Sequence, residues 1–237
     1  MTGTASGTRP KAVVSWSSGK DSAFALHEVR RAGALEVVGL LTTVTETYAR
    51  VSMHGVRENI LDAQARATGL PLHKVRIPSP CPNEVYERAM TRALDALRGD
   101  GVSRVVFGDL FLEDIRAYRE EKLRGTGVEP VFPLWGRPTD RLAGEIIDAG
   151  VRAHIVALDP RKLPAHFAGR TFDRTLLADL PDTVDPCGER GEFHTCVTAG
   201  PMFSAPIPVA PGPVVERDGF VFADLELAEL TRGTRGH

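Results

Sequence analysis

The sequence predicts an α/β protein with a doubly wound parallel sheet, followed by a smaller C-terminal α+β region. Through residue 135, short apolar runs rich in β-branched residues alternate with segments of helical periodicity. This alternation is typical of parallel strands joined by right-handed helical crossovers. The second run, 36–44, is apolar on both faces, as expected for a sheet covered by helices. After residue 135 the alternation gives way to segments rich in proline, glycine and charge.

The elements of the first part follow from apolar patterning and glycine stop signals. The run 11–16 predicts a strand, and 22–32 predicts a helix that stops at Gly33. The clearest helix covers 83–101, where apolar residues form one stripe. On the same grounds, the further strands are 36–44, 70–77, 102–110 and 129–135, and the further helices are 56–69 and 114–127.

The second part starts at residue 136 and has fewer regular signals. A helix is expected over 139–150, with Thr139 as its cap, and a strand over 151–159. The stretch 180–197 is expected to be mostly loop because it is rich in proline, glycine and charge. A hairpin is expected over 214–227, turning at Asp218-Gly219. We therefore divide the chain into 1–135 and 136–237.

The charge, apolar runs and cysteines of the chain limit the kinds of molecule that it is expected to bind. The net charge of −2 gives no general attraction to nucleic acid, and no apolar run is long enough for a membrane span. Three cysteines, Cys81, Cys187 and Cys196, form no Cys-x-x-Cys motif. We therefore expect reduced thiols in a cytoplasmic protein without nucleic-acid or membrane partners, and we keep a homodimer open.

The stretch "SWSSGKDS", residues 15–22, has the features of a phosphate-binding loop. A strand ends, a turn of small residues follows, and a helix begins with free N–H groups and a partial positive charge. Gly19 lets the backbone approach an anion, Ser17 and Ser22 offer hydroxyls, and Lys20 adds a charge. The alternative is an ordinary strand-to-helix turn with an exposed lysine.

The loop is not a Walker A motif. That motif needs a glycine where this chain has Val14, and a serine or threonine where it has Asp21. A Rossmann G-x-G-x-x-G is also missing from this loop. The mode of phosphate binding therefore belongs to another class.

The loop resembles the S-G-G-K-D-S loop of the ATP pyrophosphatases, or PP-loop enzymes, which have a HUP-like fold. These enzymes cleave ATP between the α and β phosphates and adenylate a substrate. Ser18 stands where many members have glycine. The stretches "VVFGDLFLEDIRAYREEKL", "FPLWG", "DPCGERGEFHT" and "GPMF" resemble the diphthamide synthetase family, whose eukaryotic and archaeal members ligate ammonia to diphthine. Together the matches run from Ala12 to Phe203.

The resemblance implies an ATP-binding region over 1–135 and a substrate-binding region over 136–237. It implies that ATP, with Mg²⁺ at Asp21, is held by Ser15, Ser17, Ser18, Gly19, Lys20, Asp21, Ser22, Thr42, Thr43 and Val44. The catalytic candidates are Lys20, Asp21, Asp109, Glu189, Glu192 and His194. The substrate-binding candidates are His54, Gly55, Arg57, Arg116, Glu120, Gly191 and Thr195.

Several of these residues allow two interpretations. The Asp21 carboxylate would repel a phosphate, so it fits the site if it orients Lys20 or approaches a metal; otherwise it only complements the helix start. Asp109 ends a predicted strand at the sheet edge where ligands bind. Arg116 and Glu120 share one helix face, either as part of the site or as a surface ion pair.

The stretch "GERGEFHT" brings two glutamates and a histidine together. Glu192 or His194 is expected to accept a proton from ammonium, because ammonia attacks only when neutral. The alternative is solvated charge in a loop. Cys187 is disfavoured as a nucleophile, because adenylation already activates a carboxylate.

We therefore predict an ATP-dependent ligase that adenylates a small-molecule or protein-borne carboxylate, releases pyrophosphate, and transfers the acyl group to ammonia or another amine. The Ala/Arg/Gly-rich texture resembles bacterial proteins, in which diphthamide is not expected, so the carboxylate stays open. The alternatives are a PP-loop enzyme that modifies transfer RNA and a non-catalytic adenine-nucleotide-binding regulator.

Overall fold

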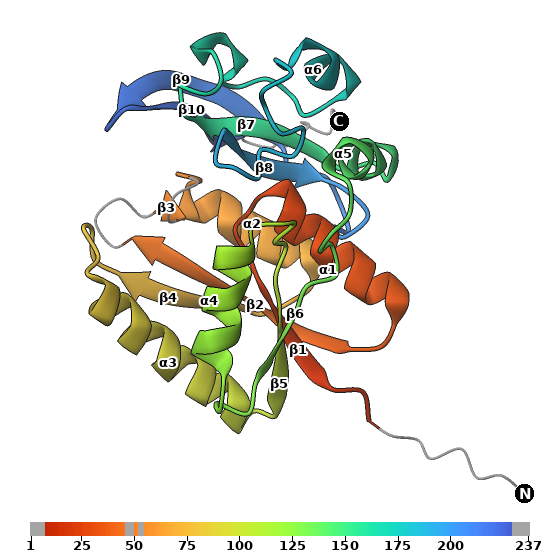
Figure 1. The fold of residues 1–237 in the computed structure, drawn as a ribbon, viewed down its shortest axis with the longest axis vertical. Helices are drawn as coiled ribbons and strands as arrows, with labels where there is room; N and C mark the ends of the chain where they lie inside the picture. Colours follow the sequence, from red (N-terminus) through yellow and green to blue (C-terminus); the bar gives the residue numbers. More distant parts are fainter. Residues whose placement is uncertain (1–7, 46–49, 52–54, 229–237) are drawn as a thin grey trace, which may run out of the picture.

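The computed structural model describes residues 8–45, 50–51 and 55–228. Its first sheet has five parallel strands in the order β4-β2-β1-β5-β6, and a short antiparallel strand, β3, pairs with the end of β2 (Figure 1). The strands are β1 (Lys11–Ser15), β2 (Glu36–Thr45), β3 (Arg50–Val51), β4 (Leu72–Ile77), β5 (Val102–Val106) and β6 (Glu129–Val131). Strand order therefore reverses between β1 and β5, which confirms the doubly wound α/β class.

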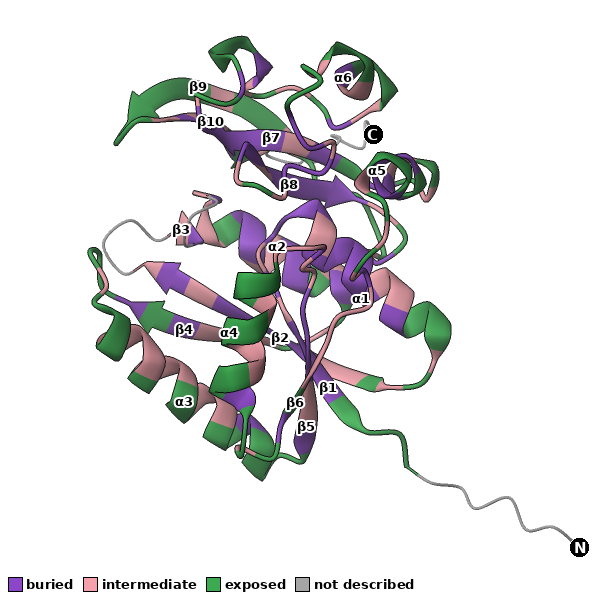
Figure 2. Ribbon diagram, viewed as in Figure 1, coloured by how far each residue is buried: buried purple, intermediate pink, exposed green. Residues whose placement is uncertain are grey.

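Helices cover both faces of this sheet. The helices α1 (Lys20–Ala32) and α2 (Glu58–Thr68) pack on one face, and α3 (Asn83–Gly99) and α4 (Glu113–Leu123) pack on the other (Figure 1). Figure 2 shows that β1 and the start of α1 are buried, whereas α3 and α4 expose their outer faces. Among the described residues, no helix combines the length and the apolarity needed to cross a membrane.

The second part folds as an antiparallel sheet in the order β8-β7-β10-β9, which lies over α1 and α2 (Figure 1). Its elements are α5 (Thr139–Asp148), β7 (Arg152–Leu158), a 3₁₀ turn (Ala165–Phe167), α6 (Arg174–Asp179), β8 (Phe193–Ala199), β9 (Val209–Arg217) and β10 (Phe220–Leu227). Because α1 is covered on both sides, one apolar core runs from β1 through α1 into β7 and β8. The division of the chain at residue 135 stays a prediction, since this core spans both parts.

The expectation that 180–197 is mostly loop is wrong from Phe193 onward, where β8 begins. Nearly all of β8 is buried, so the strand lacks the alternation of a half-exposed strand. The hairpin is confirmed, with φ of 54° at Asp218 and 77° at Gly219. Its first strand starts at Val209, earlier than expected, because Pro211 and Pro213 are tolerated on an edge strand.

Candidate functional site

Two connected cavities lie at the carboxyl edge of the first sheet, where strand order reverses. One, of about 230 Å³, contains Lys20 and is called the lysine cavity; its wall also includes Ser15, Ser17, Asp21, Ser22, Gly108, Asp109, Arg119, Cys187, Gly188, Glu189, His194 and Thr195. The other, of about 490 Å³, is called the threonine cavity; its wall includes Ser15, Trp16, Ser17, Leu41, Thr42, Thr43, Tyr86, Met90, Arg119 and His194. Ligands of doubly wound sheets bind at this edge.

Hydrogen bonds to its own serine hydroxyl groups fix the shape of the loop after β1. The N–H of Gly19 donates to Oγ of Ser17 at 3.3 Å, and the hydroxyls of Ser17 and Ser22 lie 3.1 Å apart. Ser18 has a φ of 69°, in the left-handed region that favours glycine. The loop thus presents the start of α1 to the lysine cavity.

The turn after β5 crosses directly over the start of α1. A Cβ atom on Gly108 would lie 2.7 Å from the carbonyl carbon of Asp21 and 2.8 Å from the nitrogen of Ser22. Such distances are closer than any side chain permits, so this backbone contact requires glycine. It brings Asp109 to the same cavity as Lys20 and Asp21.

Lys20 is buried, with 1% of its surface exposed, and its ammonium group is fixed. Its Nζ donates to both oxygens of Asp21, at 3.0 and 2.9 Å, and to the carbonyl of Cys187. The rings of Phe172 and Phe193 flank the ammonium, with centroids 5.2 and 5.5 Å away. Burial by itself lowers the pKa of Lys20, but Asp21, Cys187 and Glu189 together outweigh burial, so the pKa lies above its ordinary value. The cavity therefore contains a permanent cation, oriented by Asp21.

Strand β8 forms another wall of the lysine cavity and is hydrogen-bonded to the loop after β1. The N–H of Lys20 donates to Oγ1 of Thr195 at 3.1 Å, and the N–H of Val197 donates to the carbonyl of Ser18 at 2.9 Å. The amide of Gln64 donates to the same Ser18 carbonyl at 3.2 Å and to the Val197 carbonyl at 2.8 Å. Sequence analysis missed Gln64. Its signal is a polar residue one helical turn after the buried Ile60, on the same face of α2.

Burial shifts the pKa values of three titratable groups in residues 187–194, in different directions. Burial and the nearby Asp21 raise the pKa of Glu189 to about 7, although its Oε1 accepts a hydrogen bond from the Leu110 N–H at 2.8 Å. Burial and the Lys20 charge lower the pKa of His194 to about 4, so its imidazole is neutral at pH 7. Burial raises the pKa of the Cys187 thiol well above its usual value, so no thiolate forms at neutral pH.

Glu192 lies outside the set of residues that line the lysine cavity. It is buried, its Oε1 accepts a hydrogen bond from the Asp185 N–H at 3.0 Å, and its Oε2 has no partner among the described residues. Asp185 in turn accepts hydrogen bonds from the N–H groups of Cys187 and Glu189. Glu192 thus contacts the segment that shapes the loop, while Glu189 contacts the cavity.

Arg119, which sequence analysis missed, lines both cavities. Its guanidinium forms a bidentate ion pair with Asp109, with Nε 2.5 Å from Oδ2 and Nη2 3.1 Å from Oδ1. Arg116 and Glu120 instead pair with each other at 2.7 Å and lie outside the lining of both cavities. The signal for Arg119 is its helical spacing from Leu112 and Ile115, which line the same cavity.

The remaining candidates lie elsewhere. The guanidinium of Arg57 contacts Asp224 of β10, at 2.6 Å, and Gly55 packs near Phe222. Gly191 is in the turn before β8 and Val44 is buried within β2, and neither is among the residues lining the two cavities. His54 lies outside the described residues.

The residues fit a nucleoside triphosphate. A helix N-terminus, Lys20 and Arg119 offer positive charge at the lysine cavity. The buried hydroxyl of Thr42 has no partner among the described residues and belongs to a wall of the threonine cavity. No group of three or more metal-ligating side chains gathers in the described parts of the chain. At the lysine cavity, the Asp21 carboxylate suits Mg²⁺ that is held by one carboxylate together with ligand phosphates, the usual arrangement for this ion.

Comparison with known families agrees with these features. The model of the diphthamide synthase N-terminal domain matches residues 10–130, and that of the diphthamide synthase C-terminal domain matches residues 138–226. A search of the curated proteins gives no match. The family implies an enzyme of the ATP pyrophosphatase type, and hence the use of ATP. The chain belongs to the diphthamide synthase family.

Proposed function

We propose that the protein is an AMP-forming, ATP-dependent ligase that joins a carboxylate to ammonia or another amine. The observation that carries this proposal is the lysine cavity, where a fixed cation, Lys20, and a carboxyl group with a pKa near 7, Glu189, line one space. The first group suits a phosphate leaving group, and the second suits a proton acceptor.

In this proposal the nucleotide spans both cavities. The adenosine would occupy the threonine cavity along the end of β2, and the phosphates would lie at the start of α1. Ser15, Ser17, Arg119 and His194 line both cavities, so the α-phosphate would lie near them. Mg²⁺, when bound, would neutralise part of the phosphate charge.

The first step is adenylation. A carboxylate oxygen of the substrate forms a bond to the α-phosphorus, and the bond between that phosphorus and the bridging oxygen breaks, so that pyrophosphate leaves. The positive charges of Lys20 and of the α1 N-terminus stabilise the departing charge without rearranging, because hydrogen bonds already fix them.

The second step transfers the acyl group. The amine nitrogen forms a bond to the acyl carbon, the bond from that carbon to the AMP oxygen breaks, and a proton must be taken up. Glu189 is the favoured acceptor because a base works best when its pKa lies near the working pH. His194 is too weak a base, with a pKa near 4, and Glu192 contacts Asp185 rather than the cavity.

An exchange assay tests the proposal. ATP, radiolabelled pyrophosphate and a panel of carboxylic acids are mixed with the enzyme, and label entering ATP is measured. We expect exchange that requires one class of acid. Exchange should fall at least ~10-fold in Lys20→Met, because the variant removes the positive charge beside the proposed pyrophosphate leaving group. Exchange that no acid stimulates would contradict adenylation of a carboxylate.

A further inference from the structure

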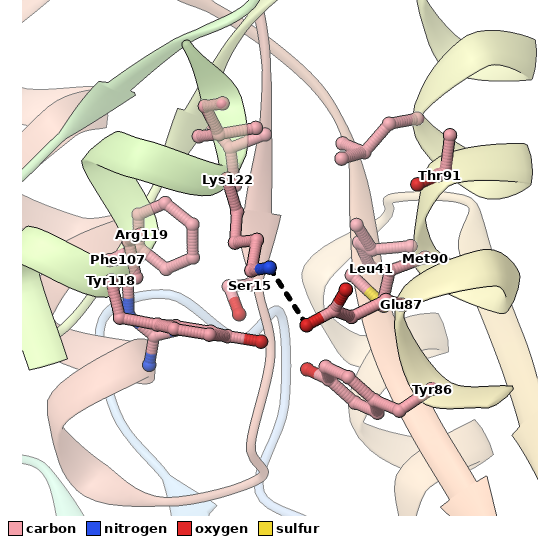
Figure 3. Close-up of a pocket in the computed structure, with 13 residues that line it drawn as sticks. Ser15, Leu41, Tyr86, Glu87, Met90, Thr91, Phe107, Tyr118, Arg119 and Lys122 are labelled. Carbon is pink, nitrogen blue, oxygen red and sulfur yellow. Dashed lines mark ion pairs between the residues drawn. The ribbon is translucent and has the colours of Figure 1, made fainter. Parts of the chain in front are cut away.

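A third cavity, of about 130 Å³, lies between α3 and α4 above the first sheet (Figure 3). We call it the tyrosine cavity, after Tyr86 and Tyr118 on its wall. The side chains Leu41, Met90, Leu94, Val105, Phe107 and Leu123 give it an apolar lining. Leu41, Val105 and Leu123 are buried in the core, so this lining is a fixed floor.

The rim of the tyrosine cavity is polar. Nζ of Lys122 on α4 lies 2.8 Å from a carboxylate oxygen of Glu87 on α3, and 5.5 Å from the ring centroid of Tyr118. Figure 3 shows the two tyrosine hydroxyls and this ion pair pointing toward one another. The side chains of Lys122 and Glu87 are 43% and 32% exposed, so this end meets solvent.

The tyrosine cavity adjoins the two cavities of the candidate site and shares lining residues with them. Ser15 and Arg119 line all three. Leu41, Tyr86 and Met90 line both the tyrosine cavity and the threonine cavity. A molecule in the tyrosine cavity would therefore have one end beside Ser15 and Arg119, where the proposed α-phosphate lies.

We propose that the tyrosine cavity is the acceptor subsite and takes the apolar body of the carboxylic acid to be adenylated. The inference rests on the proposed ligase function. The carboxylate would face Arg119, the apolar body would lie on the floor, and a second polar group would meet Lys122 and Glu87. A cavity of roughly 150 Å³ holds benzene, so this one suits a single small ring or a branched chain.

Adenine fits this space less well than the threonine cavity does. A purine base needs hydrogen-bonding partners when it is buried, because unpaired polar atoms are costly. The threonine cavity supplies the buried, unpartnered Thr42 hydroxyl, whereas the floor of the tyrosine cavity is hydrocarbon and aromatic. The two spaces therefore divide between nucleotide and acid.

The experiment fills the tyrosine cavity with a larger side chain introduced on α3. Thr91 is an exposed residue that lines the tyrosine cavity and neither of the others, so Thr91→Phe should fold normally and occupy the space. Arg92→Phe places the same ring at the next exposed position, outside the set lining the cavity, and is the control. Melting temperatures of both variants check folding.

The probes are acetate, 3-methylbutanoate and 3-phenylpropanoate, each tested by ligand-observed NMR with AMP present and by pyrophosphate exchange. In the wild type, affinity should rise at least ~10-fold from acetate to 3-phenylpropanoate, from burial of the apolar body. Thr91→Phe should lose that gain and keep ATP affinity within about threefold, while Arg92→Phe should change neither.

Four outcomes would overturn the inference. Equal affinity for the three acids would mean that no apolar subsite exists, and loss of ATP affinity in Thr91→Phe alone would mean that the cavity holds the base. Exchange with 3-phenylpropanoate that stays at the wild-type level in Thr91→Phe would overturn the subsite and leave the ligase function standing. Absence of acid-dependent exchange in the wild type would contradict the ligase function, and the inference would fail with it.

Discussion

The N–H of Lys20 donates a hydrogen bond to Oγ1 of Thr195 at 3.1 Å, across 175 positions of sequence. Two positions away on each side, the N–H of Val197 donates to the carbonyl of Ser18. The first turn of α1 and strand β8 therefore form one hydrogen-bonded unit, so the loop after β1 is fixed by the second sheet as well as by the first.

Thr195→Val should destabilise the protein by about 1–3 kcal/mol, because a buried N–H loses its acceptor while the side-chain volume is kept. Thr198→Val is the control on the same strand, where the hydroxyl makes only a 3.4 Å contact with the Arg152 carbonyl. Urea denaturation measures both. An equal loss in the two variants would show that the Lys20 contact has no special weight.

Lys20→Met should weaken ATP binding by at least ~10-fold, because the variant removes a cation at the proposed phosphate site and leaves the Asp21 carboxylate without its partner at the same cavity. Methionine keeps an unbranched apolar side chain of similar length and removes the ammonium that lies over the Phe172 and Phe193 rings. Lys11→Met, at the opposite end of β1, is the control. Calorimetry with ATP on both variants gives the result, and an unchanged affinity in Lys20→Met would remove this lysine from the phosphate site.

Glu189→Gln should depress amide formation by ~100-fold or more, the range for losing a general base. The wild-type rate should rise with pH through about 7, where Glu189 ionises, and the variant should lack this rise. Glu192→Gln should keep it, because Glu192 contacts Asp185 instead. Rates of AMP formation in single turnovers from pH 5.5 to 8.5 distinguish them, and a pH rise that disappears only in Glu192→Gln would reverse the assignment.

The same group predicts the sign of a stability change. The folded protein raises the pKa of Glu189 from 4.5 to about 7, so between these values the folded state binds more protons than the unfolded state. The contribution of Glu189 to the free energy of unfolding is therefore greatest below pH 4.5, and this contribution is lost as pH rises through about 7. Glu189→Gln should flatten this part of the stability profile, and an unchanged slope would mean that Glu189 titrates normally.

Arg119→Ala should reduce kcat/KM for AMP formation by at least ~10-fold, because the cation that reaches all three cavities is lost. Arg116→Ala is the matched control on the same helix: its guanidinium packs against Phe132 and Trp135 and lies outside these cavities. Steady-state kinetics of both variants decide between them. A larger loss in Arg116→Ala would reverse the assignment of the two arginines.

The first sheet could be predicted from sequence because its signals are local. Its parallel strands contain apolar and β-branched residues and alternate with segments of helical periodicity, and five parallel strands appear where the sequence predicts them. Strand β8 gave no such signal, because its pairing with β7 and its burial against the loop after β1 depend on distant residues. The proline, glycine and charge just before Phe193 also favoured a loop.

The candidate site divides in the same way. Residues 15–22 are consecutive in the chain, so they lie close together in any fold. The choice between Glu189 and Glu192, or between Arg116 and Arg119, depends on which side of a loop or helix faces the cavity, and a three-residue difference decides it. Composition gives both members of each pair the same chemistry, and only packing separates them.

The most direct test of the proposed chemistry is the identity of the spent nucleotide. Purified protein is incubated with ATP, Mg²⁺, ammonium and the acid that supports exchange, and the products are separated by chromatography. Cleavage between the α and β phosphates predicts AMP and pyrophosphate in equal amounts, formed at least ~10-fold more slowly in Lys20→Met. ADP and inorganic phosphate as the main products would contradict it.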